Sequence, residues 1–172
     1  MKTADVIIVG SGASGLFNAL FLPQDYKVIV ITKKEVEESD SFLAQGGISA
    51  LKNPEDYDSY FEDTMKAGHY ENDKGAVEKM IKESPQIIQD LKDFGVRFDL
   101  KDGEIEFTRE GGHSTFRILH HEDLTGKEIT SHLYEEAKKR DNITIMENCM
   151  MIDIIEKDGE CKGIVYKDQD GN

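Results

Sequence analysis

Two short segments carry glycines and small polar residues at spacings suited to holding a nucleotide. The first follows the apolar run Val6–Val9 directly and consists of Gly10, Ser11, Gly12, Ala13, Ser14 and Gly15. In such a turn the first glycine permits the tight bend, the second lets the backbone approach a pyrophosphate, and the third lets a helix pack on the strand. The pyrophosphate accepts hydrogen bonds from the free N–H groups where that helix begins. The pattern therefore predicts a dinucleotide site.

The elements around this turn strengthen the prediction, because a glycine pattern alone is weak evidence. Val6–Val9 is short and β-branched, which is typical of a buried parallel strand. Apolar residues then recur at helical spacing until Pro23, and residues 26–31 form a second apolar run. Strand, helix and strand thus fit within the roughly 30 residues of a compact βαβ unit.

The end of the second predicted strand departs from the usual dinucleotide pattern. Thr32 stands where an acidic residue for a ribose hydroxyl is expected, although a threonine hydroxyl can also bind a ribose. Lys33 and Lys34 follow, and they are either solvated loop residues or partners for the 2′-phosphate of NADP. Glu35 is near enough to replace the missing acid. The first motif leaves these alternatives open.

Composition limits the class of protein. The 172 residues include 21 basic and 35 acidic side chains, a formal net charge of −14, which argues against nucleic acid or anionic membranes as partners. The two cysteines, Cys149 and Cys161, belong to no CxxC motif or Cys/His cluster, so no metal site is expected. Free thiols and the lack of a signal or membrane-spanning run in this sequence predict a cytoplasmic protein.

Several further elements are expected along the chain. Helices are predicted over residues 54–68, 73–94 and 126–139, with a break in the second at Ser84-Pro85 and a cap at Gly95. A strand is predicted over residues 143–146, and hairpins are expected around Asp102-Gly103 and Asp158-Gly159. Because the last hairpin ends on a turn at residues 168–172, we expect this chain to be an N-terminal piece of a longer protein.

Three segments in order, residues 10–16, 41–50 and 108–126, carry a family resemblance. They read GSGASGL, SFLAQGGISA and TREGGHS continuing to RILH and DLTG. Together they resemble the fumarate reductase/succinate dehydrogenase flavoprotein family, and within it the L-aspartate oxidase branch. The resemblance implies an α/β, Rossmann-like FAD-binding domain with three layers, a parallel sheet and an antiparallel hairpin meander. It also implies that residues 1–172 form an incomplete domain with a helical insertion at about 54–95, without the capping and C-terminal domains.

The resemblance implies FAD as the cofactor, not NAD(P). Residues 11–14 would hold the pyrophosphate, Lys33 would lie near the adenosine ribose, and residues 40–47 would contact the flavin side. Met150 and Met151 would meet the adenine through their backbone, although plain strand packing also explains them. The expected cofactor-binding residues are Gly10, Ser11, Gly12, Ala13, Ser14, Gly15, Thr32, Lys33, Asp40, Ser41, Phe42, Leu43, Ala44, Gln45, Gly46, Gly47, Met150 and Met151. Dehydrogenases carry a flavin-linking histidine where this chain has Asp40, so FAD is expected to be non-covalent.

The resemblance also implies two substrate-binding residues, Glu110 and His113. Glu110 replaces an aromatic residue of the dehydrogenases, and its carboxylate would meet the α-amino group of L-aspartate, because a buried ammonium needs a partner. The alternative is a solvated loop acid. His120 and His121 are expected to have structural roles. No catalytic residue is expected within this chain, and Arg109 and Arg117 are not assigned to catalysis.

The implied reaction is oxidation of L-aspartate to iminoaspartate, with fumarate or dioxygen as acceptor, in the first step of de novo NAD biosynthesis. The imine would then pass to quinolinate synthase. Two alternatives stay open: a fumarate reductase or succinate dehydrogenase-type flavoprotein, and a free-standing, non-enzymatic FAD-binding module. These 172 residues alone are expected to be inactive.

Overall fold

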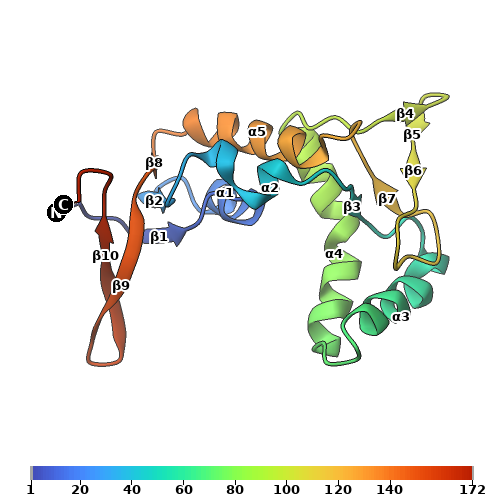
Figure 1. The fold of residues 1–172 in the computed structure, drawn as a ribbon, viewed down its shortest axis with the longest axis horizontal. Coiled ribbons are helices and arrows are strands. Elements are labelled where there is room, and N and C mark those ends of the chain that lie inside the picture. Colours follow the sequence, from blue (N-terminus) through green and yellow to red (C-terminus); the bar gives the residue numbers. More distant parts are fainter. Residues whose placement is uncertain (1, 172) are drawn as a thin grey trace. The chain divides into compact units, whose positions relative to one another are not determined.

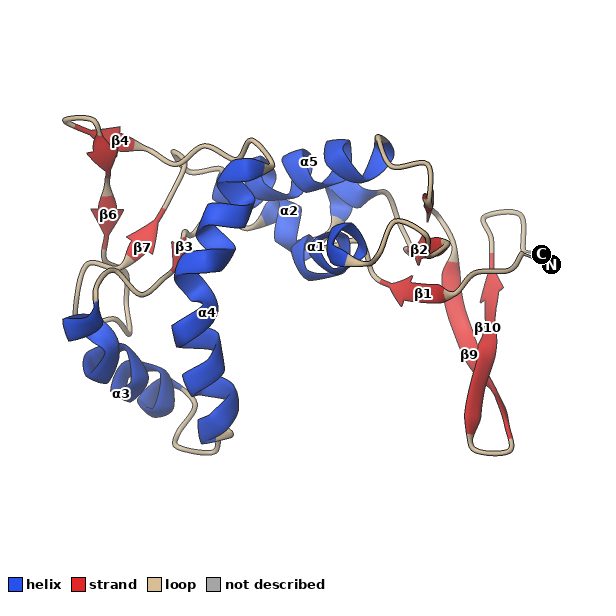
Figure 2. Cartoon of the chain, turned by 180° about the vertical axis from the view of Figure 1, so that it is seen from behind, coloured by secondary structure: helices blue, strands red, loops and turns tan. Residues whose placement is uncertain are grey.

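The computed structural model describes residues 2–171, which form two compact units (Figure 1, Figure 2). Unit 1 combines the chain up to Ala44 with the chain from Gly126 onward, and unit 2 is Gln45–Thr125. The first expected nucleotide segment lies wholly in unit 1. The second is divided between the units, because the boundary falls between Ala44 and Gln45.

Unit 1 contains a parallel sheet of β1 (Val6–Val9), β2 (Val28–Ile31) and β8 (Ile143–Met146), in the order β1-β2-β8. Every residue of the central strand β2 is buried, as expected for a strand covered on both faces. On one face Val28 and Val30 pack against Ala19 of α1 (Ala13–Phe21). The predicted βαβ unit is therefore confirmed, with the second strand beginning at Val28 and not at residue 26.

The other face of this sheet is turned toward the hairpin of β9 (Met150–Lys157) and β10 (Glu160–Lys167). Its turn residues Asp158 and Gly159 have φ angles of 58° and 78°, as the tight turn of a two-residue hairpin requires. Side chains of the hairpin and of the sheet, including Ile29 and Ile31, line a groove of about 430 Å³. Helix, sheet and hairpin make the predicted three layers.

Three helical segments complete unit 1. The 3-10 turn η1 (Val36–Glu38) and α2 (Asp40–Leu43) follow β2, and α5 (Thr125–Lys138) precedes β8. The apolar face of α5 is buried through Ile129, Leu133 and Ala137, which confirms the amphipathic helix expected there.

Unit 2 is built on two packed helices. The 3-10 turn η2 (Pro54–Asp56) leads into α3 (Tyr57–Ala67), and α4 (Lys74–Asp93) follows. Tyr60 and Met65 of α3 pack against Val77 and Ile81 of α4. An antiparallel sheet has the order β3 (Ile48–Ser49), β7 (Ile118–Leu119), β6 (Phe107–Thr108), and β4 (Leu100–Lys101) pairs with β5 (Glu104–Ile105).

The predicted break at Ser84-Pro85 is wrong, because α4 runs unbroken through Pro85. Proline has no N–H to donate to the carbonyl of Ile81 four residues earlier. The Ser84 hydroxyl donates to that carbonyl instead, at 2.7 Å, and accepts from the N–H of Leu51 at 2.8 Å. A side chain therefore replaces the hydrogen bond that proline removes.

Residues 2–171 have three further properties, which concern membranes, metals and thiols. None of the described helices is long and apolar enough to span a membrane. Within the same residues, no cluster of His, Cys, Asp and Glu has an arrangement that could hold a metal ion. Cys149 is buried, Cys161 is exposed, and both are free thiols.

Candidate functional site

The glycine turn in unit 1 brings the start of α1 directly against the end of β1. Gly10 has a φ of 114°, and its N–H donates to the Ile31 carbonyl at 2.8 Å. A Cβ on Gly15 would lie 2.0 Å from the Gly10 carbonyl oxygen, so only glycine allows this approach. Gly12 is the N-cap residue of α1, and no side chain caps it. The first-turn N–H groups of α1 are thus available to an anionic ligand.

The first part of the second segment lies beside this turn. A Cβ on Gly12 would lie 2.8 Å from the Ser41 hydroxyl oxygen of α2. Ser39 caps α2 by accepting from the Phe42 N–H at 3.3 Å. At the start of α5, the N–H of Gly126 donates to the Ala44 carbonyl at 3.0 Å. Residues far apart in the sequence are therefore held together at the carboxyl ends of the parallel strands, where ligands of such sheets bind.

A cavity of about 540 Å³ opens at this place in unit 1. Nine of the expected cofactor residues line it: Gly10, Ser11, Gly12, Thr32, Lys33, Asp40, Ser41, Met150 and Met151. The Ser11 hydroxyl is buried and has no hydrogen-bond partner among the described residues. A buried polar group left unpaired costs about 1–3 kcal/mol, so this orphaned donor fits an acceptor that a ligand supplies. A phosphate oxygen beside the start of α1 meets that requirement.

The other expected residues of unit 1 lie in the helical segments beside the cavity. Ala13, Ser14 and Gly15 form the first turn of α1. Phe42 and Leu43 end α2, and Ala44 is its C-cap. The remaining three residues, Gln45, Gly46 and Gly47, begin unit 2.

Hydrogen bonds at the ends of β2 and β8 fix the part of the cavity lined by Thr32 and the residues after Cys149. The N–H of Thr32 donates to the Met146 carbonyl at 2.9 Å, and the Thr32 carbonyl accepts from the Cys149 N–H at 2.9 Å. The Val36 N–H donates to the Glu147 carboxylate at 2.9 Å, which holds the loop that follows Thr32. Thr32 and the residues that follow Cys149 thus line the cavity.

Lys34 is paired with a neighbouring acid in this part of the cavity. Its ammonium lies 2.8 Å from the Glu38 carboxylate, and this hydrogen bond and charge raise the pKa of Lys34. Glu35 and Lys34 both line the cavity. Lys34 and Glu38 thus form an exposed ion pair at the edge of the cavity.

Several cavity residues were not predicted from the sequence. These are Val9, Ile31, Glu38, Ser39 and Cys149. Ser39 has a recognisable signal, since serine before a short helical turn is a typical N-cap. No motif or spacing marks Cys149 in the sequence. It reaches the cavity because it follows the end of the parallel strand β8.

In unit 2, the remaining part of the second segment lies beside the predicted substrate loop. A Cβ on Gly47 would lie 2.2 Å from the Leu119 carbonyl oxygen, so β3 and β7 approach closely there. A Cβ on Gly46 would lie 3.8 Å from the Glu110 carboxylate. The Glu110 side chain is exposed. The fold therefore places an accessible carboxylate next to the glycines expected on the flavin side.

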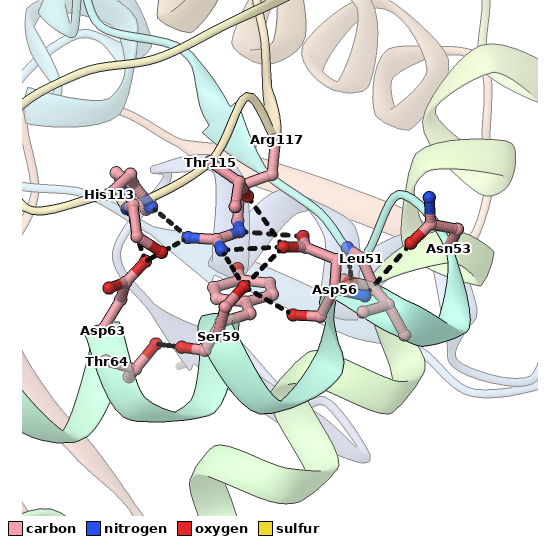
Figure 3. A network of polar contacts seen from close by, with 12 residues as sticks. Leu51, Asn53, Asp56, Ser59, Asp63, Thr64, His113, Thr115 and Arg117 are labelled. Carbon is pink, nitrogen blue, oxygen red and sulfur yellow. Dashed lines mark hydrogen bonds and ion pairs between the residues drawn. The ribbon is translucent and has the colours of Figure 1, made fainter.

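A buried ion-pair network in unit 2 was not predicted from the sequence (Figure 3). Arg117 is completely buried, and its guanidinium donates to Asp56 at 2.8 and 2.9 Å, to Asp63 at 2.6 Å and to Ser59 at 2.7 Å. Burial alone would raise the pKa of Asp56. Hydrogen bonds from Arg117, Thr115 and Ser59, with the charge of Arg117, outweigh burial and lower that pKa to about 2.

The same network holds the loop that carries the predicted substrate residues. Asp63 also accepts from the backbone N–H and the hydroxyl of Ser114, at 2.7 and 2.8 Å. The Nδ1 atom of His113 lies 3.1 Å from Arg117 Nη1. Asp63 and Ser114 are 51 residues apart in the sequence, so no local spacing predicts their contact.

The other histidines make structural contacts. His120 and His121 lie 3.1 and 3.3 Å from the Asp99 carboxylate, and His132 lies 3.2 Å from Glu128 one helical turn away. These distances agree with the structural roles expected for His120 and His121.

The parallel sheet, the glycine turn against an uncapped helix start and the cavity at the strand ends define a Rossmann-like dinucleotide-binding domain. Residues 5–172 match the model of a protein family described as FAD binding domain, and the chain belongs to that family. FAD is therefore the cofactor, as predicted, and the orphaned Ser11 hydroxyl and free α1 N–H groups fit its pyrophosphate.

Curated relatives support the branch predicted from the sequence. The chain is 42% identical over 165 residues to an L-aspartate oxidase of Clostridium perfringens, covering 96% of the chain and 38% of the relative. It is 46% identical over 160 residues to the L-aspartate oxidase of Clostridium acetobutylicum, covering 92% of the chain and 37% of the relative. The chain thus spans less than two fifths of each relative, and its predicted resemblance to this branch is confirmed.

Solved structures confirm the predicted fold class. The quinol fumarate reductase FrdA of E. coli, in a mutant form, superposes with a TM-score of 0.88 at 26% identity, over 95% of this chain and 29% of that one. Sdh1 of Mycobacterium smegmatis, in complex with UQ1, gives a TM-score of 0.85 at 27% identity, over 97% of this chain and 31% of that one.

Proposed function

We propose that this chain is the FAD-binding portion of an L-aspartate oxidase, which converts L-aspartate to iminoaspartate with fumarate or dioxygen as acceptor. The observation that carries the proposal is the accessible Glu110 carboxylate beside Gly46. The relatives named L-aspartate oxidase support it over nearly the whole chain. In this account residues 1–172 include a helical insertion at about 54–95, and the capping and C-terminal domains lie outside them.

The residues of unit 1 bind and orient the cofactor in this proposal. The Ser11 hydroxyl and the first turn of α1 hold the pyrophosphate, Thr32 and Lys33 meet the ribose, and the backbone of Met150 and Met151 meets the adenine. Because Asp40 cannot form the linkage that a histidine makes, FAD is bound non-covalently. When bound, FAD supplies the acceptor for the two electrons that leave the substrate.

The residues of unit 2 select the substrate. The Glu110 carboxylate pairs with the α-ammonium of L-aspartate, and His113 lies near a substrate carboxylate. A charge-assisted hydrogen bond is stronger than a neutral one. Succinate has no amino group to offer this carboxylate, so the pairing favours L-aspartate over succinate.

A second candidate, a fumarate reductase-type flavoprotein, is favoured by the superposition on a quinol fumarate reductase. The carboxylate of Glu110 favours the oxidase instead. The proposal extends to quinolinate synthase as the protein that takes up the imine, and to a cytoplasmic location.

The experiment compares Glu110→Gln with the wild type in the complete oxidase polypeptide to which we assign this domain. Because a hydrogen bond to a charged group contributes about 1.5–3 kcal/mol, KM for L-aspartate should rise about 10- to 100-fold. Glu104→Gln is the control, since Glu104 is an exposed carboxylate on β5 in the same unit. An unchanged KM in Glu110→Gln, or a wild type that prefers succinate, would overturn the proposal.

A further inference from the structure

Residues 109–116, in the loop that joins β6 to β7, form no helix or strand. Within it, the N–H of His113 donates to the Glu110 carbonyl at 3.2 Å, and Gly112 has a φ of 88°. Such a segment takes its position from the groups that anchor it. Those anchors therefore decide where the Glu110 carboxylate lies.

Asp63 of α3 is the central anchor of this loop (Figure 3). A single oxygen, Oδ2, accepts from the Ser114 N–H, the Ser114 hydroxyl and Arg117 Nη1, at 2.7, 2.8 and 2.6 Å. Burial would raise the pKa of Asp63, but the hydrogen bonds from Ser114 and Arg117 lower it, so the carboxylate stays charged.

Arg117 holds the same loop from its other end. Its planar guanidinium is fixed on the far side by Asp56 of η2, and it lies over the Tyr60 ring at 4.9 Å from the ring centre. Thr115 donates to the same Asp56 carboxylate at 2.7 Å. Since a guanidinium carries its donors in a rigid fork, loop and helix are joined in one arrangement.

Arg117 also holds the imidazole of His113. An arginine nitrogen only donates, so His113 Nδ1, 3.1 Å from Nη1, is placed to accept. The Tyr60 ring lies on the same imidazole, with the two ring centres 6.4 Å apart. Contacts with Arg117 and Tyr60 therefore fix the position of the His113 ring.

We propose that Asp63 and Arg117 are positioning residues for substrate recognition: they fix loop 109–116, and with it the Glu110 carboxylate and the imidazole of His113. This inference rests on the proposed function, because it concerns the same substrate loop. Neither residue touches the substrate. They act by holding Glu110 beside Gly46 and the His113 ring beside Arg117.

The first experiment measures Asp63→Asn in the complete flavoprotein, with Glu62→Gln as the matched control. Glu62 is an exposed carboxylate on the same helix and accepts only a tyrosine hydroxyl among its described side-chain hydrogen bonds. A displacement of about 1 Å in a positioning element can cost about a hundredfold, so KM for L-aspartate should rise about 10- to 100-fold in Asp63→Asn. FAD content and kcat should change less than about threefold. The Ki of succinate should rise less than KM for L-aspartate, because succinate can lose its contact with His113 but has no ammonium to lose at Glu110.

A purely structural role would lower FAD content, kcat and both affinities together, and that result would overturn the inference. So would equal KM values in Asp63→Asn and Glu62→Gln. If the wild type itself is not reduced by L-aspartate, the proposed function fails instead, and the two failures are distinct.

A second variant decides the inference should Asp63→Asn not fold. Ser114→Ala removes one hydrogen bond to Asp63 and should raise KM for L-aspartate by about threefold or more, since a typical hydrogen bond contributes about 1 kcal/mol. An unchanged KM in Ser114→Ala contradicts the inference.

Discussion

Replacing Gly15 with alanine should disrupt both the packing of α1 and the binding of FAD. The new Cβ would lie 2.0 Å from the Gly10 carbonyl oxygen, about 1.4 Å short of the 3.4 Å at which ordinary contact begins. The obstacle is backbone, so no side chain can rotate away. The helix or the glycine turn must therefore move.

The size of the effect follows from two opposing contributions. Overpacking against backbone costs about 3 kcal/mol, at the upper end of its range, and alanine in a helix regains about 1 kcal/mol over glycine. The free energy of unfolding should fall by about 2 kcal/mol, which lowers Tm by about 4–8 °C for a domain of this size. Displacing the α1 N–H groups from the pyrophosphate should weaken FAD binding about 10- to 100-fold, since each hydrogen bond to a charged group contributes about 1.5–3 kcal/mol.

The assay is thermal unfolding together with titration of the apoprotein of the complete flavoprotein with FAD. Gly111→Ala is the control, because a Cβ there would meet no atom within 4 Å. The control should keep wild-type FAD affinity and Tm. Wild-type FAD affinity in Gly15→Ala would refute the assignment of this turn to the pyrophosphate.

The remaining predictions concern unit 2. The pKa of Asp56 is lowered to about 2 from its ordinary value of 3.8, so its stabilisation is complete above pH 4 and is lost as the pH falls through 2. That loss amounts to about 2 kcal/mol and should appear in acid unfolding curves of the wild type but be reduced in Asp56→Asn. Ser84→Ala should lower the free energy of unfolding by about 1–3 kcal/mol, measured in urea, because the Ile81 carbonyl and the Leu51 N–H each lose a partner. The first expectation would be contradicted if Asp56→Asn and the wild type had the same acid unfolding curve. The second would be contradicted if Ser84→Ala kept the urea midpoint of the wild type.

The residues that line the cavity in unit 1 could largely be predicted, because the glycine turn and the elements around it follow one another directly in the sequence. Gly10, Gly12 and Gly15 meet physical demands within one βαβ unit, and the sequence shows the turn, the helix and both strands together. Thr32 and Met150 follow strands whose carboxyl ends meet at one edge of a parallel sheet. Glu147 was not predictable, because its contact with the Val36 N–H links positions 111 residues apart.

The ion-pair network that holds the substrate loop was not predictable either, because its members are far apart in the sequence. Arg117 meets Asp56 and Asp63 across 61 and 54 residues of sequence, and either acid would be taken for a solvated helix residue. The unbroken α4 shows a different limit. The rule that proline ends a helix is local, whereas Ser84 satisfies the freed carbonyl with its own side chain.

Whether Glu110 selects L-aspartate is tested by adding L-aspartate or succinate, without oxygen, to the complete flavoprotein and recording the oxidised flavin absorbance. L-aspartate should bleach this absorbance and succinate should not, and bleaching by L-aspartate should weaken in Glu110→Phe. Bleaching by succinate alone would contradict the proposed function and place the protein with the fumarate and succinate enzymes.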